Sequence, residues 1–286
     1  MTITRNDVSR YKIICDEMIT KTQIAKDYRT LRILFIANTS ILEDFQKQIT
    51  DAIGGCFQGM LPSQAHAYAY KQNRGAIAIN TDNLMNKTSE NCVFIILEEF
   101  CHLLDYAAVD FAQSIQFLSF CKDYSKHVGS HFSSQVSEQL GTHYDHYYVN
   151  KLMLSFDVEK WIQFKSNYYG LSSRAQLNRL FAEIKATKPA RHCLAIITTE
   201  ILHMLSFSRA VESFLAHAEL LEEQKQQLTE IKNNTDEIIR FAEQNARTID
   251  KSYPNTVDYF KLNDFVSKDS FFIRVKQFWN YLHLFG

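Results

Sequence analysis

Four ionisable residues, Glu98, Glu99, His102 and Asp105, interrupt the otherwise apolar segment CVFIILEEFCHLLDYAAV at residues 92–109. In a helix, with about 100° per residue, all four side chains project from one arc of about 120°. Carboxylates beside an imidazole are costly to bury on such a helix unless they are paired, hydrogen-bonded or bound to a metal. The alternative is a surface helix with this arc in solvent, but the other faces are too apolar for a simple surface helix.

The residues around this arc resemble the active-site helix of the zincin metallopeptidases, in particular their gluzincin branch. That helix carries the motif HExxH, whose two histidines bind zinc and whose glutamate is the general base. In this chain residues 98–102 are EEFCH, and Leu103-Leu104-Asp105 resembles the xLD that often follows the motif. The resemblance covers about residues 30–150, in this order: a strand at 31–38, a backing helix at 41–53, the pair Gly54-Gly55, and strands at 65–71 and 75–80 before the motif.

This resemblance implies a zinc site with a variant motif, EExxH. Glu98 would be a zinc ligand in place of histidine, and His102 would be the second ligand. Glu99 would be the general base that deprotonates the zinc-bound water. Asp105 would orient an imidazole nitrogen. The strand at 75–80 would be the edge strand that lines the substrate cleft in zincins.

The third zinc ligand should come from a later helix, and the candidate segment is EQLGTHYDHYYV at residues 138–149. In gluzincins this ligand is a glutamate, and one register of their pattern places Glu138 there. His143 is the alternative, because Glu98, His102 and His143 would restore a set of two histidines and one glutamate. Both alternatives remain open at this point.

A second pair of motifs competes with the zincin interpretation. Glu99–His102 and Glu200–His203 are both ExxH, which ferritin-like di-iron proteins carry on separate helices of a four-helix bundle. Two such motifs are unsurprising by chance in a chain with ten histidines, and the strands upstream do not belong in a bundle. Taken alone, His203 is typical of a hydrogen-bonded core histidine, and His143 and His146 are typical of a partly exposed polar and aromatic helix face.

The scarcity of turn-forming residues indicates the fold class. Eight glycines and three prolines among 286 residues predict a mostly helical chain and exclude a sandwich or propeller of short strands. Half of the glycines lie between residues 54 and 75, so the strands should lie in the N-terminal half. We expect an α+β protein that is predominantly helical, with a small zincin-like sheet in a domain at 1–150 and an all-α domain at 151–286.

The hydrophobic periodicity predicts helices at 5–28, 41–53, 91–120, 132–166, 173–186, 190–218, 219–248 and 267–284. Within 219–248 an approximate heptad spacing favours ordinary bundle packing, with a protein partner bound through these helices as the alternative. The residues that keep this spacing are Leu221, Leu228, Ile231, Ile238 and Ala242.

Charge and cysteine usage limit the function further. A net charge of −1 leaves no electrostatic surface for nucleic acid or for an anionic membrane. The six cysteines form no CxxC pair and the first residues contain no apolar run of signal-peptide length, which predicts a cytoplasmic protein. The function we expect is a metallopeptidase-like hydrolase with one zinc ion that cleaves a peptide or protein substrate. The alternatives are a catalytically degenerate zincin that binds or regulates a partner, and a ferritin-like oxidase with iron.

Overall fold

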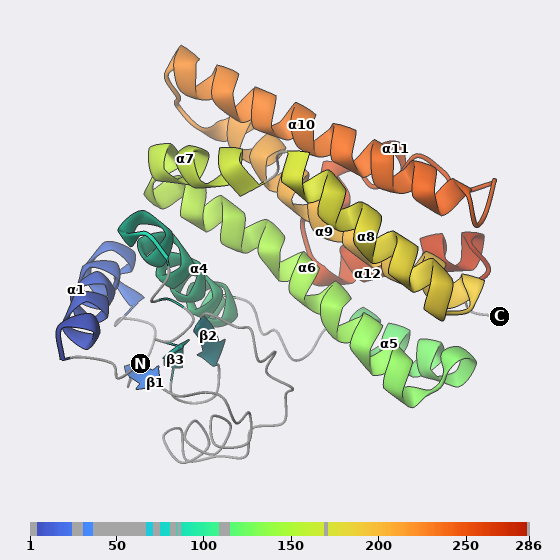
Figure 1. The fold of residues 1–286 in the computed structure, drawn as a ribbon, viewed down its shortest axis with the longest axis horizontal. Helices are drawn as coiled ribbons and strands as arrows, with labels where there is room; N and C mark the ends of the chain where they lie inside the picture. Colours follow the sequence, from blue (N-terminus) through green and yellow to red (C-terminus); the bar gives the residue numbers. More distant parts are fainter. Residues whose placement is uncertain are drawn as a thin grey trace. The chain divides into compact units, whose positions relative to one another are not determined.

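The computed structural model describes residues 5–24, 31–36, 67–70, 75–80, 84, 87–108, 115–168 and 171–284 (Figure 1). Chain contacts divide the protein into two compact units, Met1–Asp110 and Phe111–Gly286, here called the N-terminal unit and the helical unit. The described residues are predominantly helical, which confirms the expectation from the low glycine and proline content. The domain boundary predicted at residue 150 falls inside the helix Ser130–Phe156.

The described part of the N-terminal unit contains a three-stranded sheet of β1 (Leu31–Ile36), β2 (Ala67–Tyr70) and β3 (Gly75–Asn80). The strand order is β1-β3-β2, and β3 pairs parallel with β1 and antiparallel with β2. The prediction that residues 75–80 form an edge strand is therefore wrong for this sheet, because β3 has a neighbour on each side. The central position suits its apolar side chains, since Ile77 and Ile79 are both fully buried.

Helix α4 (Ser89–Ala108) packs on this sheet and on helix α1 (Arg5–Thr22). Thr88 caps the start of α4, because its Oγ1 accepts a hydrogen bond of 3.3 Å from the backbone N–H of Asn91. Arg10 of α1 donates a hydrogen bond of 2.7 Å to Oγ of Ser89. The helix that carries Glu98, Glu99 and His102 is thus held at its first turn. The predicted helix at 41–53 lies outside the described residues.

The predicted helix at 91–120 is wrong in its length, because α4 ends at Ala108 and α5 (Ile115–Val128) is a separate helix. The predicted helix at 132–166 is likewise two helices, α6 (Ser130–Phe156) and α7 (Val158–Tyr168). Asp157 separates them. Its backbone N–H bonds to the carbonyl of Met153 at the end of α6, and its Oδ1 accepts from the N–H of Lys160 at 3.2 Å in the first turn of α7.

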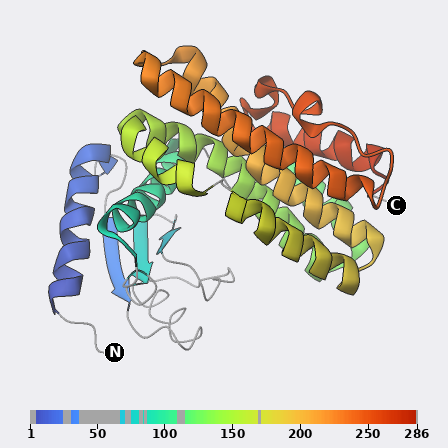
Figure 2. The same cartoon turned by 45° about the horizontal axis from the view of Figure 1, so that its top comes forward.

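Helix α9 (Ala190–His217) lies at the centre of the helical unit and contacts α6, α8 (Leu171–Thr187) and α10 (Glu222–Arg247) (Figures 1 and 2). Most of its residues are buried. Among the described residues it is the one helix long and apolar enough to cross a membrane, but 83% of its most apolar window is buried inside the protein. Core helices pass the same test, so this is weak evidence for a membrane span.

Helix α10 packs against α7, α8 and α9. The heptad residues Leu228, Ile231, Ile238 and Ala242 are buried, whereas Leu221 is exposed. The heptad spacing therefore serves packing within the unit, which is the interpretation that the sequence favoured. A partner bound through these helices stays a prediction.

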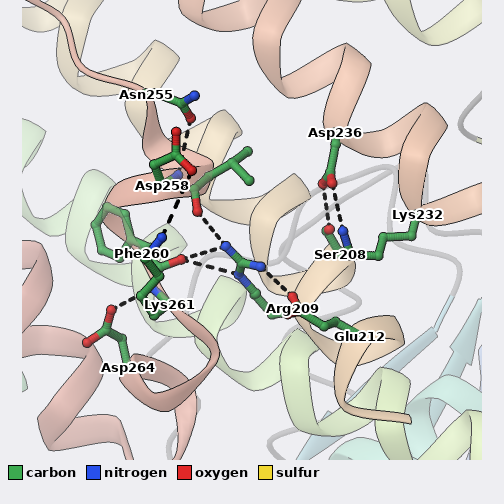
Figure 3. A network of polar contacts seen from close by, with 11 residues as sticks. Ser208, Arg209, Glu212, Lys232, Asp236, Asn255, Asp258, Phe260, Lys261 and Asp264 are labelled. Atoms are coloured by element: carbon green, nitrogen blue, oxygen red, sulfur yellow. Dashed lines mark hydrogen bonds and ion pairs between the residues drawn. The ribbon is translucent and has the colours of Figure 1, made fainter. Parts of the chain in front are cut away.

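The remaining elements of the helical unit are α11 (Thr256–Tyr259), η3 (Leu262–Phe265) and α12 (Lys268–Tyr281). Arg209 of α9 fixes this part of the chain, because its guanidinium donates hydrogen bonds to the backbone carbonyls of Val257 and Phe260 and pairs with Glu212 (Figure 3). Beside it, Ser208 donates a hydrogen bond of 2.6 Å to Asp236 of α10. Buried charge-assisted contacts of this kind hold α9 in one position along its neighbours.

Candidate metal site

Three histidines from two neighbouring helices meet in the helical unit. His143 and His146 lie three residues apart on α6, a spacing that places both side chains on one face of the helix. His203 lies on α9, which packs along α6 (Figure 1). We call these three residues the three-histidine cluster.

The ring nitrogens of the cluster lie close together. One nitrogen from each ring can be chosen so that all three lie within 4.8 Å of one another. Nδ1 of His146 and Nε2 of His203 are 3.1 Å apart. The rings of His143 and His203 are stacked, with centroids 4.5 Å apart and an interplanar angle of 13°. The cluster therefore offers three nitrogen donors to one small volume.

His143 is buried, with 8% of its surface exposed, and neither of its ring nitrogens has a hydrogen-bond partner among the described residues. A neutral imidazole has one N–H to donate and one nitrogen to accept with. Leaving a buried polar group without a partner costs about 1–3 kcal/mol. A ligand that binds a ring nitrogen would offset this cost, so His143 is the member of the cluster that most needs one.

Burial keeps two histidines of the cluster, His143 and His203, neutral. Burial lowers the pKa of His143 well below its usual value, and the neighbouring His203 lowers it further. Burial also lowers the pKa of His203 to about 4, and the positive charge of Lys165 contributes to this shift. Both rings are therefore neutral at pH 7, and neutral imidazole is the form that binds metal ions.

Helix α7 is fixed to both helices of the cluster. Asn150, one turn after His146 on α6, accepts a hydrogen bond of 3.3 Å from the indole N–H of Trp161 on α7. Trp161 in turn stacks on Phe207 of α9, with ring centroids 5.1 Å apart and an interplanar angle of 12°. These contacts position the histidine-bearing faces of α6 and α9 against one another.

The three imidazole nitrogens fit a divalent transition metal of intermediate softness, such as zinc. Two imidazole nitrogens on one tetrahedral zinc, each at 2.0–2.1 Å from the ion, are separated by about 3.3 Å. The 3.1 Å between His146 and His203 is close to that value. Other distances in the cluster reach up to 4.8 Å, so the rings would have to move together around an ion. Nitrogen-only donors suit zinc, copper, nickel or iron rather than magnesium or calcium.

The residues of the EExxH motif lie on α4 in the N-terminal unit, as predicted. Glu98 and His102 offer ligand atoms within 4.8 Å of one another, as expected for side chains one turn apart. Burial lowers the pKa of His102, and the carboxylate of Glu98 opposes that shift. Glu99 lies on the same helix, and the side chain of Asp105 falls outside the described residues.

The two candidates for the third ligand belong to the other unit. The side chain of Glu138 on α6 falls outside the described residues. His143 is placed by the structure in the three-histidine cluster. Its joint ligation of zinc with Glu98 and His102 stays a prediction, because the two units are described separately.

One expectation about the histidines is corrected and one is confirmed. His143 is buried rather than part of a partly exposed helix face. His203 is hydrogen-bonded, as expected, and its partner is Nδ1 of His146 on α6. The HxxH spacing at 143–146 was a usable signal in the sequence. His203 could not have been added to it, because 57 residues separate it from His146 and only the pairing of α6 with α9 brings the two together.

The substitution His143→Leu is expected to separate metal binding from stability. Leucine has a similar size and no polar atoms, so it removes two unpartnered nitrogens from a buried position. The metal-free protein should gain about 1–3 kcal/mol in its free energy of unfolding. Urea unfolding in the presence of a chelator measures this gain, and zinc titration should show that binding is lost.

His192→Leu is the matched control. His192 also lies on a helix of the cluster, α9, but its ring stacks on Phe132 with centroids 4.0 Å apart, outside the cluster. This variant should keep zinc binding and should not gain stability. A loss of more than about 1 kcal/mol in His143→Leu would show that the imidazole stabilises the metal-free fold and has no unmet need for a ligand.

Comparison with known proteins adds no relative: no family model, no curated protein and no solved structure matches this chain.

Proposed function

We propose that the protein binds one divalent transition-metal ion in its helical unit, through His143, His146 and His203. The observation that carries this proposal is His143, a buried imidazole with two unpartnered nitrogens that stacks on a second histidine. The lowered pKa values of His143 and His203 support it, because a metal would meet neutral ligands at physiological pH.

Zinc is the ion that we expect. Three neutral nitrogen donors without a thiolate are typical of zinc sites in which a fourth position is left for water or substrate. Copper binds such donors more tightly under the Irving–Williams order, so availability rather than affinity would favour zinc. Magnesium and calcium prefer oxygen ligands and should not compete.

Elemental analysis tests this proposal. Protein purified without added metal, and then titrated with zinc after chelation, should bind about one zinc ion per chain in the helical unit. Two irons per chain would instead establish the di-iron alternative. If no metal binds after titration, the proposal is wrong and a metal-free binding protein becomes the better interpretation.

A metallopeptidase-like hydrolase is the second candidate, and the observation that favours it is the Glu98–His102 pair on α4. In this candidate Glu98 and His102 are zinc ligands, Glu138 or His143 adds a third, and Glu99 deprotonates the bound water that attacks a peptide carbonyl. A degenerate zincin that holds a peptide or protein partner without cleaving it is the non-catalytic form of this candidate. The cytoplasm remains the expected location for either form.

Substitutions of Glu98 and Glu99 distinguish the hydrolase candidate from metal binding at the three-histidine cluster alone. Glu99→Gln removes a proton acceptor and no zinc ligand, so cleavage of an unstructured protein such as casein should fall by about 10²–10⁴ while zinc content stays constant. Glu98→Gln should weaken zinc binding, and Glu98→His should strengthen it by restoring HExxH. Equal zinc content in all three proteins and in His102→Ala would remove α4 as a metal site without affecting the proposal for the three-histidine cluster.

A further inference from the structure

A second route, through helix α7, joins the histidines of α6 and α9. The side-chain amide of Asn150 donates a hydrogen bond of 2.6 Å to the backbone carbonyl of His146, one turn earlier on α6. The same amide accepts the bond of 3.3 Å from the indole of Trp161, which stacks on Phe207 of α9. Phe207 follows His203 by four residues, so the two side chains lie one turn apart on the same face. We call these contacts the α7 link.

Burial restricts which residue can occupy position 150. Asn150 and Trp161 are both buried, so the carbonyl of His146 and the indole N–H need partners from the protein. An amide offers a donor to the first and an acceptor to the second, whereas leucine offers neither and aspartate lacks the donor. Asparagine is unfavourable inside a helix, by up to about 0.7 kcal/mol relative to alanine. Its tertiary contact, rather than helix formation, therefore explains its place in α6.

The α7 link restrains the two helices at the place where a metal would join them. It fixes the turn that follows His146 on α6 and the turn that follows His203 on α9. Nδ1 of His146 and Nε2 of His203 are 3.1 Å apart, close to the separation of about 3.3 Å that two nitrogens have on a tetrahedral zinc. A functional site must be held within about 0.5 Å of its productive geometry, which requires supporting contacts of this kind.

We propose that Asn150 and Trp161 are positioning residues of the metal site, which hold His146 and His203 at the separation that the ion requires, and that the metal in turn strengthens their contact. The inference rests on the metal site proposed above and extends it to residues that are not ligands. Coupling between two contacts is reciprocal, so a contact that raises metal affinity is itself stabilised by the metal. Metal binding between α6 and α9 is thereby sensed on α7.

Zinc titration of two variants tests the α7 link from both of its sides. Asn150→Thr keeps a hydroxyl that can donate to the carbonyl of His146, but it is too short to reach the indole. Trp161→Phe keeps a ring against Phe207 and removes the N–H. Each variant should bind zinc about tenfold to a hundredfold more weakly, the usual cost of losing a group that orients a metal ligand. The double variant should be no weaker than either single one, because both changes remove the same contact.

Thr198→Val is the matched control. Thr198 is fully buried on α9, donates a hydrogen bond of 2.7 Å to the carbonyl of Leu194 and lies 3.1 Å from the hydroxyl of Tyr253, so it combines the same two kinds of contact as Asn150. It lies about 140° around the helix from His203. Valine has nearly the same shape and removes both contacts, so this variant should lose stability in urea unfolding and keep the zinc affinity of the wild type.

Tryptophan fluorescence gives a readout that a change in stability alone would not move. The chain has two tryptophans, Trp161 and Trp279, so Trp161→Phe leaves Trp279 as the single emitter. Saturating zinc should change the emission of the wild type and of Thr198→Val, because the surroundings of the Trp161 indole tighten. The emission of Trp161→Phe should stay constant over the same titration.

Each failure has a different meaning. If zinc does not bind to the wild type, the metal site and this inference are both wrong. If zinc binds and Asn150→Thr and Trp161→Phe match Thr198→Val in affinity, the metal site stands and the positioning role is overturned. A wild-type emission that zinc leaves unchanged would overturn the response of α7. If Asn150→Thr does not fold, Asn150→Ser and Trp161→Phe test the same contact.

Discussion

His203→Ala should weaken zinc binding to the helical unit by about 100-fold or more. The substitution removes one of three nitrogen donors, and the remaining two come from a single helix, so the ion loses its link between α6 and α9. Loss of groups that merely orient a ligand already costs 10- to 100-fold in metal affinity, and loss of a ligand should cost at least as much. Competition with a chromophoric zinc chelator measures the change.

His217→Ala is the matched control for this substitution. His217 lies on the same helix but outside the cluster, and its Nδ1 is 2.8 Å from the carbonyl of Ser213. Zinc at 100 times its dissociation constant should stabilise the wild type and this control by about 2.7 kcal/mol, and His203→Ala should lose that stabilisation. Equal zinc affinity in both variants would remove His203 from the site.

The helices of this protein could be predicted from its sequence because local signals determine them. Glycine and proline are scarce, and the apolar periodicity placed α8, α9, α10 and α12 within a few residues of their observed ends. The break at Asp157 was missed because no glycine or proline marks it. An aspartate can cap a helix or lie on the polar face of a continuous helix, so the residue type alone did not indicate a break. The central position of β3 was missed because pairing order depends on contacts distant in sequence.

The candidate site could be predicted only in part. His143 was one of two candidates for a third ligand, beside Glu138, because an imidazole would restore a set of two histidines and one glutamate. Its partner His203 depends on the packing of α6 against α9, and neither helix shows that pairing in its own sequence. His203 also occurs in an ExxH motif, which was paired with Glu99–His102 rather than with the histidines of α6. The hydrophobic periodicity of a single sequence predicts individual helices, but it does not predict which distant helices pack against one another.

The protonation of His143 and His203 should make zinc affinity depend only weakly on pH between 7.5 and 5.5. Two imidazoles with the ordinary pKa of about 6.5 would each be about 90% protonated at pH 5.5, and competition from these protons would weaken zinc binding by about 100-fold. In the folded protein the pKa of His203 is about 4 and that of His143 is also well below its usual value. Because these pKa values are lowered, the neutral ligand forms persist at pH 5.5, and these two residues should weaken binding by less than about twofold.

The affinity should then fall as the pH drops through about 4, where His203 takes up a proton in the folded state. Zinc titrations at fixed pH, corrected for protonation of the competing chelator, measure this profile. The same titration of the urea-unfolded chain is the control, and it should show the steep loss between pH 7.5 and 5.5, because unfolding returns each histidine to water and to its ordinary pKa. If the folded protein also lost about 100-fold over this range, the histidines that bind zinc would be solvated ones, and the buried cluster of His143 and His203 would not be the site.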